Sequence, residues 1–194
     1  MGRPKADLPV AGKPLVQWAV ETACSVTEHV VVVLGPDRPV PEALSGNALV
    51  TCLSNPEPQR GLASSVAIGV EHGLRAVAHG TWIFVTLGDL PLILRRTYRL
   101  LWNARVPGHV VFPRYRDATP ADRFDRGHPV LLPREAAEHL LAQRDAISTM
   151  RQLTQQFPEV VVDVADPGIR ADVDRPQDIA DAVARLNALQ APSD

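Results

Sequence analysis

Short apolar runs alternate with longer amphipathic stretches along the whole chain. Apolar runs bounded by turn residues predict strands at 30–34, 48–53, 81–89, 109–113, 128–132 and 160–164. Stretches with one apolar helical face predict helices at 15–25, 62–76, 94–103, 134–142, 148–157 and 177–189, with a short helix at most at 41–44. This alternation of strands and helices predicts an α/β fold with a mostly parallel sheet.

The run from residue 81 ends abruptly in Gly88-Asp89. Its nearly continuous apolar character is typical of a strand buried on both faces, as in a parallel sheet. Pro91 cannot continue a central strand, so the chain is expected to turn there and present the Asp89 carboxylate. Ligands of open α/β sheets bind at the carboxyl ends of the strands, and a carboxylate suits Mg²⁺ that also holds phosphates. The alternative is that Asp89 caps the following helix.

The chain has 194 residues, which suits a single domain over residues 1–194. Its net charge of -2 and pI of about 6.3 argue against a nucleic-acid footprint or a polybasic membrane surface. There is no apolar run of about 18 residues to cross a membrane and no signal-peptide pattern, so a cytoplasmic location is expected. Cys24 and Cys52 are isolated in apolar surroundings and are interpreted as buried thiols.

The basic residues are almost all arginine. Of the 20 basic residues only Lys5 and Lys13 are lysines, and both are near the start of the chain, where residues 1–14 are loop-like. A lysine in an arginine-rich chain offers a compact point charge, which suits a phosphate. With only two cases, a chance distribution is an equally good explanation.

Two further polar sites have both a functional and a structural interpretation. Ser64 and Ser65 follow Gly61 in the first turn of a predicted helix, where free N–H groups and the helix dipole favour an anion or a polar base edge. Taken alone, this motif is better explained by helix capping. His128 stands at the start of a predicted strand, where it could contact a phosphate or a carbonyl or serve a purely structural role.

Two acids stand at alternate positions just before the last predicted helix. If residues 171–174 are extended, Asp172 and Asp174 face the same way, and one of them could be a second metal ligand opposite Asp89. The alternative is that Asp174 caps the terminal helix, with Pro176 near its first position.

Five motifs follow one another along the chain: Met-Gly-Arg-Pro-Lys-Ala-Asp-Leu-Pro, Asn55 with Gly-Leu-Ala-Ser-Ser, Leu-Gly-Asp-Leu-Pro, Arg-Gly-His-Pro and Asp-Val-Asp-Arg-Pro-Gln-Asp. In this order they resemble the MobA-like nucleotidyltransferases, and most closely the molybdenum cofactor cytidylyltransferases. The resemblance covers essentially the whole chain. It implies a Rossmann-like three-layer sandwich that transfers a nucleotide from a nucleoside triphosphate and releases pyrophosphate.

The resemblance also implies roles for single residues. Lys5, with Gly2, would belong to the loop that wraps the triphosphate, and Asp89 and Asp174 would bind Mg²⁺. The residues that would contact the nucleotide are Gly61, Ser64, Ser65 and Gly88, whereas His128 would lie near the acceptor. Mg²⁺, Lys5 and backbone donors would position and neutralise the phosphates, so direct in-line displacement is expected, without a covalent enzyme intermediate.

The chain departs from the family pattern in three ways. It begins at the Met of the phosphate loop, so the first strand and most of that loop are missing relative to the family, and the neighbouring strands would lose a pairing partner. We therefore hypothesise that Met1 is an internal methionine. Leu90 stands where cytidylyltransferases usually have Gln, so the choice of base is open. Asp7 replaces an apolar residue common in the family, close to the phosphate site.

These observations predict a Mg²⁺-dependent nucleotidyltransferase that uses CTP to load CMP onto a phosphorylated pterin, the molybdopterin cofactor, for a molybdenum hydroxylase partner. One alternative is transfer to another phosphorylated acceptor, such as a sugar or polyol phosphate. The other is a catalytically inactive chain that binds nucleotide weakly or assists a partner enzyme.

Overall fold

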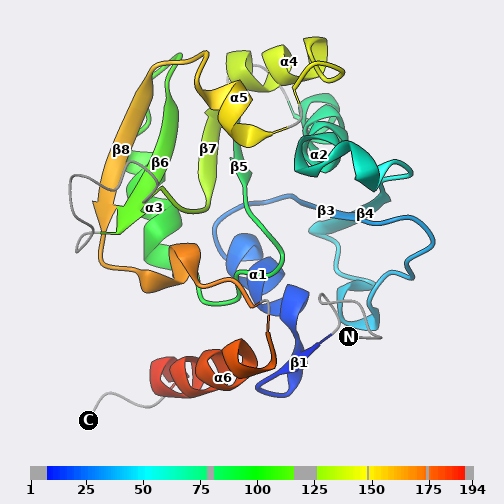
Figure 1. Cartoon of the computed structure of the whole chain (residues 1–194), viewed down its shortest axis with the longest axis vertical. Helices are drawn as coiled ribbons and strands as arrows, with labels where there is room; N and C mark the ends of the chain where they lie inside the picture. Colours follow the sequence, from blue (N-terminus) through cyan, green and yellow to red (C-terminus); the bar gives the residue numbers. More distant parts are fainter. Residues whose placement is uncertain (1–7, 78–80, 116–125, 148, 174, 191–194) are drawn as a thin grey trace.

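The computed structural model describes residues 8–77, 81–115, 126–147, 149–173 and 175–190 (Figure 1). Its strands are β1 (Pro9–Val10), β2 (Lys13–Pro14), β3 (Val30–Leu34), β4 (Val50–Ser54), β5 (Trp82–Val85), β6 (Val110–Tyr115), β7 (Val130–Pro133) and β8 (Glu159–Val164). Its α-helices are α1 (Leu15–Cys24), α2 (Leu62–Ala76), α3 (Arg95–Asn103), α4 (Arg134–Ala142), α5 (Met150–Thr154) and α6 (Pro176–Gln190). The short 3₁₀ helices are η2 (Glu42–Leu44), η3 (Pro58–Arg60) and η4 (Pro167–Arg170).

The larger strands form two sheets. One is a parallel pair in which β3 and β4 are in register from Val30 opposite Val50 to Leu34 opposite Ser54. The other has the order β5-β7-β6-β8, with β7 antiparallel to both of its neighbours and β8 parallel to β6. Strands β5, β6 and β8 therefore share one direction, and β7 runs against them. A two-residue hairpin, β1–β2, precedes α1.

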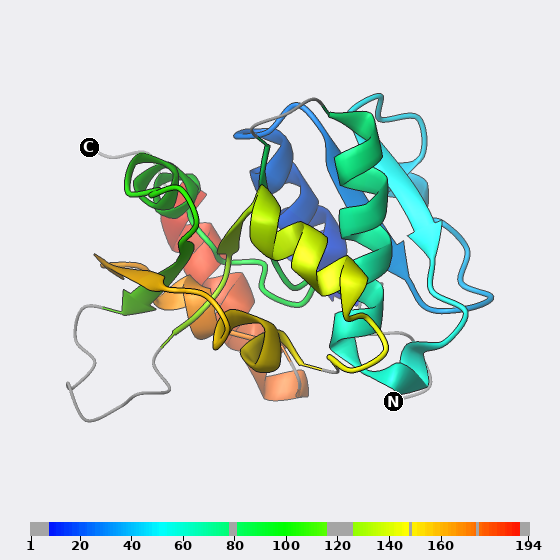
Figure 2. The ribbon, with the colours of Figure 1, turned by 90° about the horizontal axis from the view of Figure 1, so that it is seen from above.

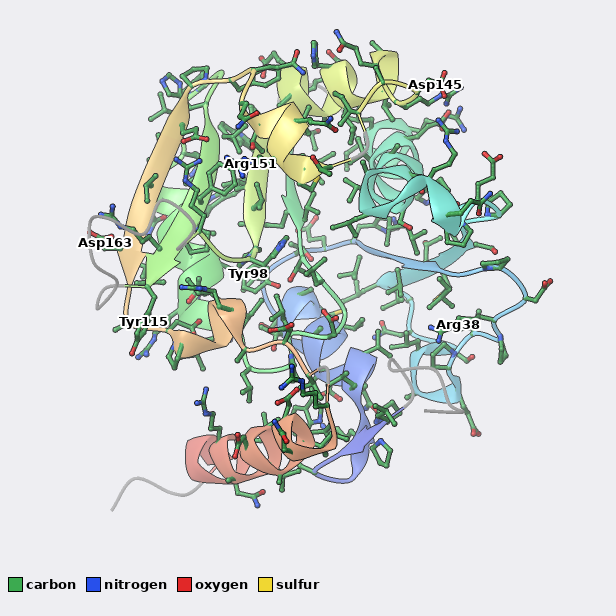
Figure 3. All side chains as sticks on the ribbon, in the orientation of Figure 1. Arg38, Tyr98, Tyr115, Asp145, Arg151 and Asp163 are labelled. Carbon is green, nitrogen blue, oxygen red and sulfur yellow. The ribbon has the colours of Figure 1, made fainter. Side chains whose placement is uncertain are left out.

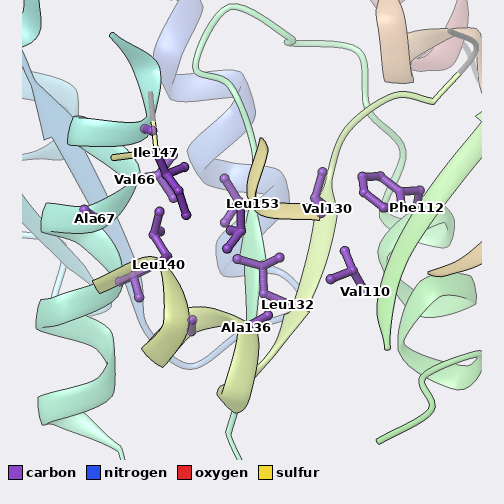
Figure 4. Packing of buried hydrophobic residues seen from close by; sticks show 14 residues of the cluster. Val66, Ala67, Val110, Phe112, Val130, Leu132, Ala136, Leu140, Ile147 and Leu153 are labelled. Carbon is purple, nitrogen blue, oxygen red and sulfur yellow. The ribbon is translucent and has the colours of Figure 1, made fainter. Parts of the chain in front are cut away.

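Helices cover both faces of these sheets, so the predicted three-layer α/β fold is confirmed (Figure 2). On one face, α2, α4 and α5 enclose the largest apolar cluster with inward side chains of β5, β6 and β7 (Figure 4). On the other face, Leu101 of α3 packs on Val111 and Leu131. The alternation of side chains along each strand sends neighbouring residues to opposite layers, which is why strands of this sheet are apolar at consecutive positions.

Helix α1 packs on the β3–β4 pair, and it covers the same side of the molecule as α3, which packs on the four-stranded sheet. Val16 and Val20 of α1 contact a cluster that includes Val30 and Val32 of β3. Tyr98 of α3 is buried near the centre of the molecule (Figure 3), in an edge-to-face arrangement with Phe84 whose ring centroids are 5.1 Å apart. Burial raises the pKa of Tyr98 to about 12, so its hydroxyl stays protonated in the core.

The C-terminal helix closes the lower part of the molecule in Figure 1, beside the β1–β2 hairpin. Ala182 and Leu186 of α6 are buried against Val10, Leu15 and Leu92 in one apolar cluster. Val173, which precedes α6, belongs to the same cluster. The packing of α6 therefore holds the segment that carries the predicted acids against the turn after β5.

Most predicted elements are present, and the differences have local causes. The predicted strand 81–89 ends at Val85, because the chain turns at residues 88–89 and again at 91–92. The predicted helix 148–157 is only Met150–Thr154, since Thr149 forms a capping box with Gln152 at its start. Residues 114–126 are polar and charged with no apolar period, which predicts an exposed loop, and they fall largely outside the described residues.

Candidate functional site

Asn55 organises the end of β4. It is 1 % exposed, and its backbone N–H donates to the Leu34 carbonyl oxygen of β3 at 2.7 Å. Its side-chain amide donates to Oγ of Ser64 at 2.8 Å and to Oγ of Ser65 at 2.9 Å, while its Oδ1 accepts from the Glu57 N–H at 2.9 Å. Asn55 thus ties the ends of two strands to the first turn of α2. Asn55 stands in the second of the five family motifs, but these contacts were not predicted for it, although an Asn-Pro pair after a strand is a turn signal.

The start of α2 is shaped by these bonds and not by a side-chain cap. Gly61 occupies the N-cap position with φ +88°, a conformation that glycine adopts without the strain of a side chain. Ser64 Oγ donates to the Gly61 carbonyl oxygen at 2.8 Å. The capping interpretation of Ser64 and Ser65 is therefore not supported, because no side chain among the described residues caps α2. Ser65 lines the cleft between β3 and β5.

Asp89 lies in the turn after β5, four residues beyond the end of the strand. The backbone N–H of Val173 donates to the Asp89 carbonyl oxygen at 3.1 Å, and the Oδ1 atom of Asp89 is buried. Gly88 stands beside α1, since a Cβ added there would be 3.5 Å from a methyl group of Val16. The structure therefore places Val173 next to the backbone of Asp89.

The alternative that Asp89 caps the following helix is wrong, since α3 has no side-chain cap among the described residues, and a different acid, Asp166, holds the start of that helix. Helix α3 begins after Leu94, whose N–H donates to Oδ2 of Asp166 at 2.9 Å. Thr97 Oγ1 donates to the same oxygen at 2.5 Å, and the Gly168 N–H donates to Oδ1 of Asp166 at 3.0 Å. Asp166 was not among the predicted site residues, although it begins an Asp-Pro-Gly turn.

His128 lies beside Asp89 at the entrance of β7. Its Nδ1 is 3.3 Å from the Val85 carbonyl oxygen, at the last residue of β5, and its backbone N–H donates to the Ile169 carbonyl oxygen at 3.0 Å. Burial lowers the pKa of His128, and this effect exceeds the opposing effects of the Val85 carbonyl and the Asp89 charge. The ring is therefore neutral at neutral pH.

Two close backbone contacts hold the segments on either side of His128 in place. A Cβ added to Gly127 would be 2.5 Å from the Ile169 carbonyl oxygen, and a Cβ added to Gly168 would be 2.1 Å from the Leu92 carbonyl oxygen. Only glycine fits at either position without a backbone shift. These contacts hold η4 against both the turn after β5 and the start of β7.

The two groups of residues meet at one end of the same cleft. Gly35, Ser65 and Gly88 all line it, so the start of α2 and the turn after β5 border a common space, whereas Asn55, Asp89 and His128 lie next to lining residues without lining the cleft themselves. The predicted phosphate-binding residues Gly2 and Lys5 and the predicted metal ligand Asp174 lie outside the described residues, as does Asp7. Leu90 is 2 % exposed and packs with Ile93 and Tyr98, so it is part of the core.

The donor chemistry at this place suits a hard cation such as Mg²⁺. A carboxylate provides oxygen ligands, and Mg²⁺ typically takes one or two carboxylates and completes its shell with phosphate oxygens and water. Within the described ranges, no group of three or more His, Cys, Asp or Glu side chains could hold a metal by itself. A site that depends on substrate phosphates is compatible with this arrangement.

Comparison with known proteins identifies the family. The family model described as the MobA-like NTP transferase domain matches residues 1–173. The chain belongs to this family. It is the same family that the five sequence motifs resemble, and the chain is accordingly a nucleotidyltransferase.

Two curated proteins are similar to the chain. The molybdenum cofactor cytidylyltransferase of Escherichia coli is 24% identical over 195 residues, which cover 97% of this chain and 92% of that protein. The bifunctional protein GlmU of Cutibacterium acnes is 38% identical over 152 residues, which cover 75% of this chain and 34% of that protein.

Solved structures share the fold. A 2-C-methyl-D-erythritol 4-phosphate cytidylyltransferase from Thermus thermophilus has a TM-score of 0.66 and 22% identity, covering 95% of this chain and 94% of its own. A nucleotidyl transferase from Methanothermobacter has a TM-score of 0.74 and 21% identity, covering 95% and 86%. The manganese complex of Rv0371c from Mycobacterium tuberculosis has a TM-score of 0.63 and 21% identity, covering 94% and 93%.

No helix among the described residues is both long and apolar enough to cross a membrane.

Proposed function

We propose that this nucleotidyltransferase acts in the cytoplasm and transfers CMP from CTP to a phosphorylated pterin, with Mg²⁺ as cofactor and release of pyrophosphate. The observation that carries the proposal is the hydrogen bond between Val173 and Asp89, which sets the acid after β5 beside the acid-bearing segment before α6. The neutral His128 next to Asp89 and the Asn55–Ser65 group across the cleft complete the proposed site.

The Asn55 side of the cleft would hold the nucleotide. The N-terminal end of α2 and the dipole of this 15-residue helix favour an anion or a polar base edge. Ser65 Oγ accepts a hydrogen bond from Asn55, so its own hydroxyl proton remains to be donated to a ligand in the cleft. Gly61 keeps the backbone accessible there because it has no side chain.

Asp89 and Asp174 would hold the Mg²⁺, and Lys5 with Gly2 would bind the phosphate tail. When bound, the cation would neutralise charge on the phosphates and orient them for in-line attack. The chain supplies the carboxylate of Asp89 in a fixed position, since both the turn at residues 88–89 and the bond from Val173 restrain its backbone. Preorganised charge of this kind needs little rearrangement during the reaction.

His128 would position the acceptor as a neutral hydrogen-bonding group. Its Nδ1 faces the Val85 carbonyl oxygen, which favours the tautomer with the proton on Nδ1 and leaves Nε2 as an acceptor. A hydroxyl or amide group of the acceptor could donate to Nε2. Because the ring carries no charge at neutral pH, phosphate neutralisation is assigned to the lysine and the cation.

The pterin acceptor is supported by the similarity to the E. coli molybdenum cofactor cytidylyltransferase along nearly the whole of both chains. A molybdenum hydroxylase would then be the partner that receives the product. A polyol phosphate is the second candidate, because a cytidylyltransferase of 2-C-methyl-D-erythritol 4-phosphate shares the fold.

Pyrophosphate release with each of the four nucleoside triphosphates, with and without Mg²⁺ and with each acceptor, tests the proposal. We expect turnover with CTP, the phosphorylated pterin and Mg²⁺ together. Asp89→Asn should lower turnover roughly 10²- to 10³-fold, as the loss of one preorganised group in an active site does. The matched control is Asp181→Asn, at an exposed position on α6, which should leave turnover unchanged.

Each alternative gives a different result. Turnover only with a polyol or sugar phosphate would replace the pterin by that acceptor. Nucleotide binding without pyrophosphate release under any condition would favour the inactive accessory protein. Full turnover in Asp89→Asn would contradict the assignment of the metal ligand.

A further inference from the structure

Asp166 is a buried acid at which three parts of the chain meet. Its side chain is 1 % exposed, and it lies between β8 and η4. Its Oδ2 accepts from the Leu94 N–H and from Thr97 Oγ1, and its Oδ1 accepts from the Gly168 N–H. Removing a carboxylate from water is costly unless hydrogen bonds replace those to water, and here three donors do so. An apolar side chain in this place would leave two buried backbone N–H groups without these acceptors.

This acid joins the two segments that lead to the proposed metal ligands. The first, residues 89–94, begins at Asp89 and ends at the residue before α3. The second, residues 168–173, is followed directly by Asp174 in the sequence. Asp166 accepts from the backbone N–H at the end of the first segment and from the N–H at the start of the second. One carboxylate therefore links the two segments.

The opposite ends of the two segments are joined by a backbone hydrogen bond. The Val173 N–H donates to the Asp89 carbonyl oxygen at 3.1 Å. Between the two ends the backbones are in contact, since a Cβ added to Gly168 would be 2.1 Å from the Leu92 carbonyl oxygen. The segments are therefore antiparallel and fastened at both ends, and Asp166 fastens the end farther from Asp89.

The second segment also makes the hydrogen bond that fixes the backbone of His128. The His128 N–H donates to the Ile169 carbonyl oxygen at 3.0 Å, and Ile169 is buried next to Gly168 in the sequence. Buried and satisfied hydrogen-bond networks are rigid, because a shift leaves a polar group without its partner. A displacement at Asp166 would therefore be transmitted to the residues proposed to hold the cation and the acceptor.

We propose that Asp166 is a positioning residue for nucleotidyl transfer, which sets the spacing between Asp89 and the segment before Asp174 and thereby the affinity for the divalent cation. This role rests on the proposed function, in which these two acids hold the cation. Asp166 acts through the backbones of the two segments, so it is not a catalytic residue. Residues that orient metal ligands typically contribute about 10- to 100-fold to metal affinity or activity.

Asp166→Asn tests the proposal, because an amide has one acceptor oxygen and cannot accept on both sides at once. Half-maximal turnover should require about 10- to 100-fold more Mg²⁺, whereas turnover at saturating Mg²⁺ should stay near that of the unaltered chain. Without substrate or cation, the Val173 amide should exchange with solvent about tenfold faster, the effect of roughly one lost hydrogen bond. The Leu131 amide, in the strand between β5 and β6, reports global opening and should accelerate less.

Thr97→Val is the matched control. It removes the third bond to the same carboxylate, but Thr97 belongs to α3 and to neither segment, so both backbone N–H groups keep their acceptors. It should lower stability without changing the Mg²⁺ requirement or the Val173 exchange rate. Gly168→Ala is a second test, because it pushes the two segments apart and leaves every polar group in place. It should raise both quantities as Asp166→Asn does, and it decides the question if Asp166→Asn fails to fold.

The possible outcomes separate this proposal from the proposed function. An unchanged Mg²⁺ requirement in Asp166→Asn, with normal turnover in the unaltered chain, would overturn the positioning role alone. Equal acceleration of Val173 and Leu131, or an equal rise in the Mg²⁺ requirement of Thr97→Val, would also overturn it, since loss of stability would then explain the effect. Absence of Mg²⁺-dependent turnover in the unaltered chain would overturn the proposed function and the positioning role with it. A raised Mg²⁺ requirement and selective exchange at Val173, in Asp166→Asn but not in Thr97→Val, support the proposal.

Discussion

Strands β3 and β7 have equally apolar sequences and different surroundings. All four residues of β7 are buried, whereas only Leu34 of the five residues of β3 is buried. The difference lies in their neighbours, since β7 is flanked by β5 and β6 but β3 pairs on one side only. An apolar run thus predicts a strand, and the adjacent strands determine how much of its side-chain surface is buried.

The same contrast holds between cross-strand partners. Ile83 of β5 is opposite Leu132 of β7 in the sheet, and both side chains belong to the same apolar cluster. Leu132 is fully buried, but Ile83 borders the cleft and is only half-buried. The boundary between a closed core and an open edge therefore runs between two neighbouring residues.

The largest expected effect is on stability, and it distinguishes Leu132 from Ile83. Leu132→Ala should lower the free energy of unfolding by about 2–5 kcal/mol, because it removes a fully buried side chain and leaves a cavity. Ile83→Ala should cost clearly less, since part of that side chain is already in contact with water. Chemical denaturation of both variants measures the difference. Equal losses would show that the β5 edge is as well packed as β7.

A second pair compares glycines on the two sides. Gly168→Ala places a Cβ against the Leu92 backbone and should cost about 1–3 kcal/mol, as overpacking of a rigid site does. Gly35→Ala meets only the Arg38 side chain at 3.7 Å, so it should change stability by about 0.5 kcal/mol or less. Arg38 lies on the loop after β3 and can move aside (Figure 3). A large loss of stability in Gly35→Ala would mean that the region after β3 is packed more tightly than described.

The smallest expected effect concerns His128, where the closed sheet meets the end of the cleft. Burial lowers its pKa below the ordinary 6.5, so below pH 6.5 the unfolded chain binds a proton more readily than the folded chain. This contribution to stability is complete above pH 6.5 and is lost as pH falls through the folded-state pKa. His128→Gln should therefore flatten the dependence of unfolding free energy on pH between 7.5 and 5.5. Identical slopes in both proteins would contradict the account.

The sequence predicted strands and helices well because their signals are local. The strand at 30–34 and the helices at 62–76 and 134–142 have the predicted bounds, since valine runs, Gly61 and Pro133 mark them clearly. The end of β5 and the short α5 were mispredicted, because turns and capping there override the apolar pattern. Burial of β3 and β5 was overestimated, since it depends on a neighbouring strand that no local pattern reports.

Within the candidate site, sequence spacing identified Asp89, Ser65 and His128 but not what holds them. Asn55 and Asp166 act through contacts with residues 10 and 72 positions away, and such contacts leave no trace in local spacing. The glycine at 168 is similarly explained only by the approach of Leu92. The roles of Gly2, Lys5 and Asp174 remain predictions of the family resemblance.

The central claim is that Asp89 holds a divalent cation at the end of the cleft when nucleotide is bound. Paramagnetic broadening of backbone amide signals by Mn²⁺ in the presence of CTP measures the position of that cation directly. We predict that the signals of Asp89, Val173 and His128 broaden first and that Asp89→Asn abolishes this pattern. Broadening centred elsewhere, or unchanged broadening in Asp89→Asn, would contradict the claim.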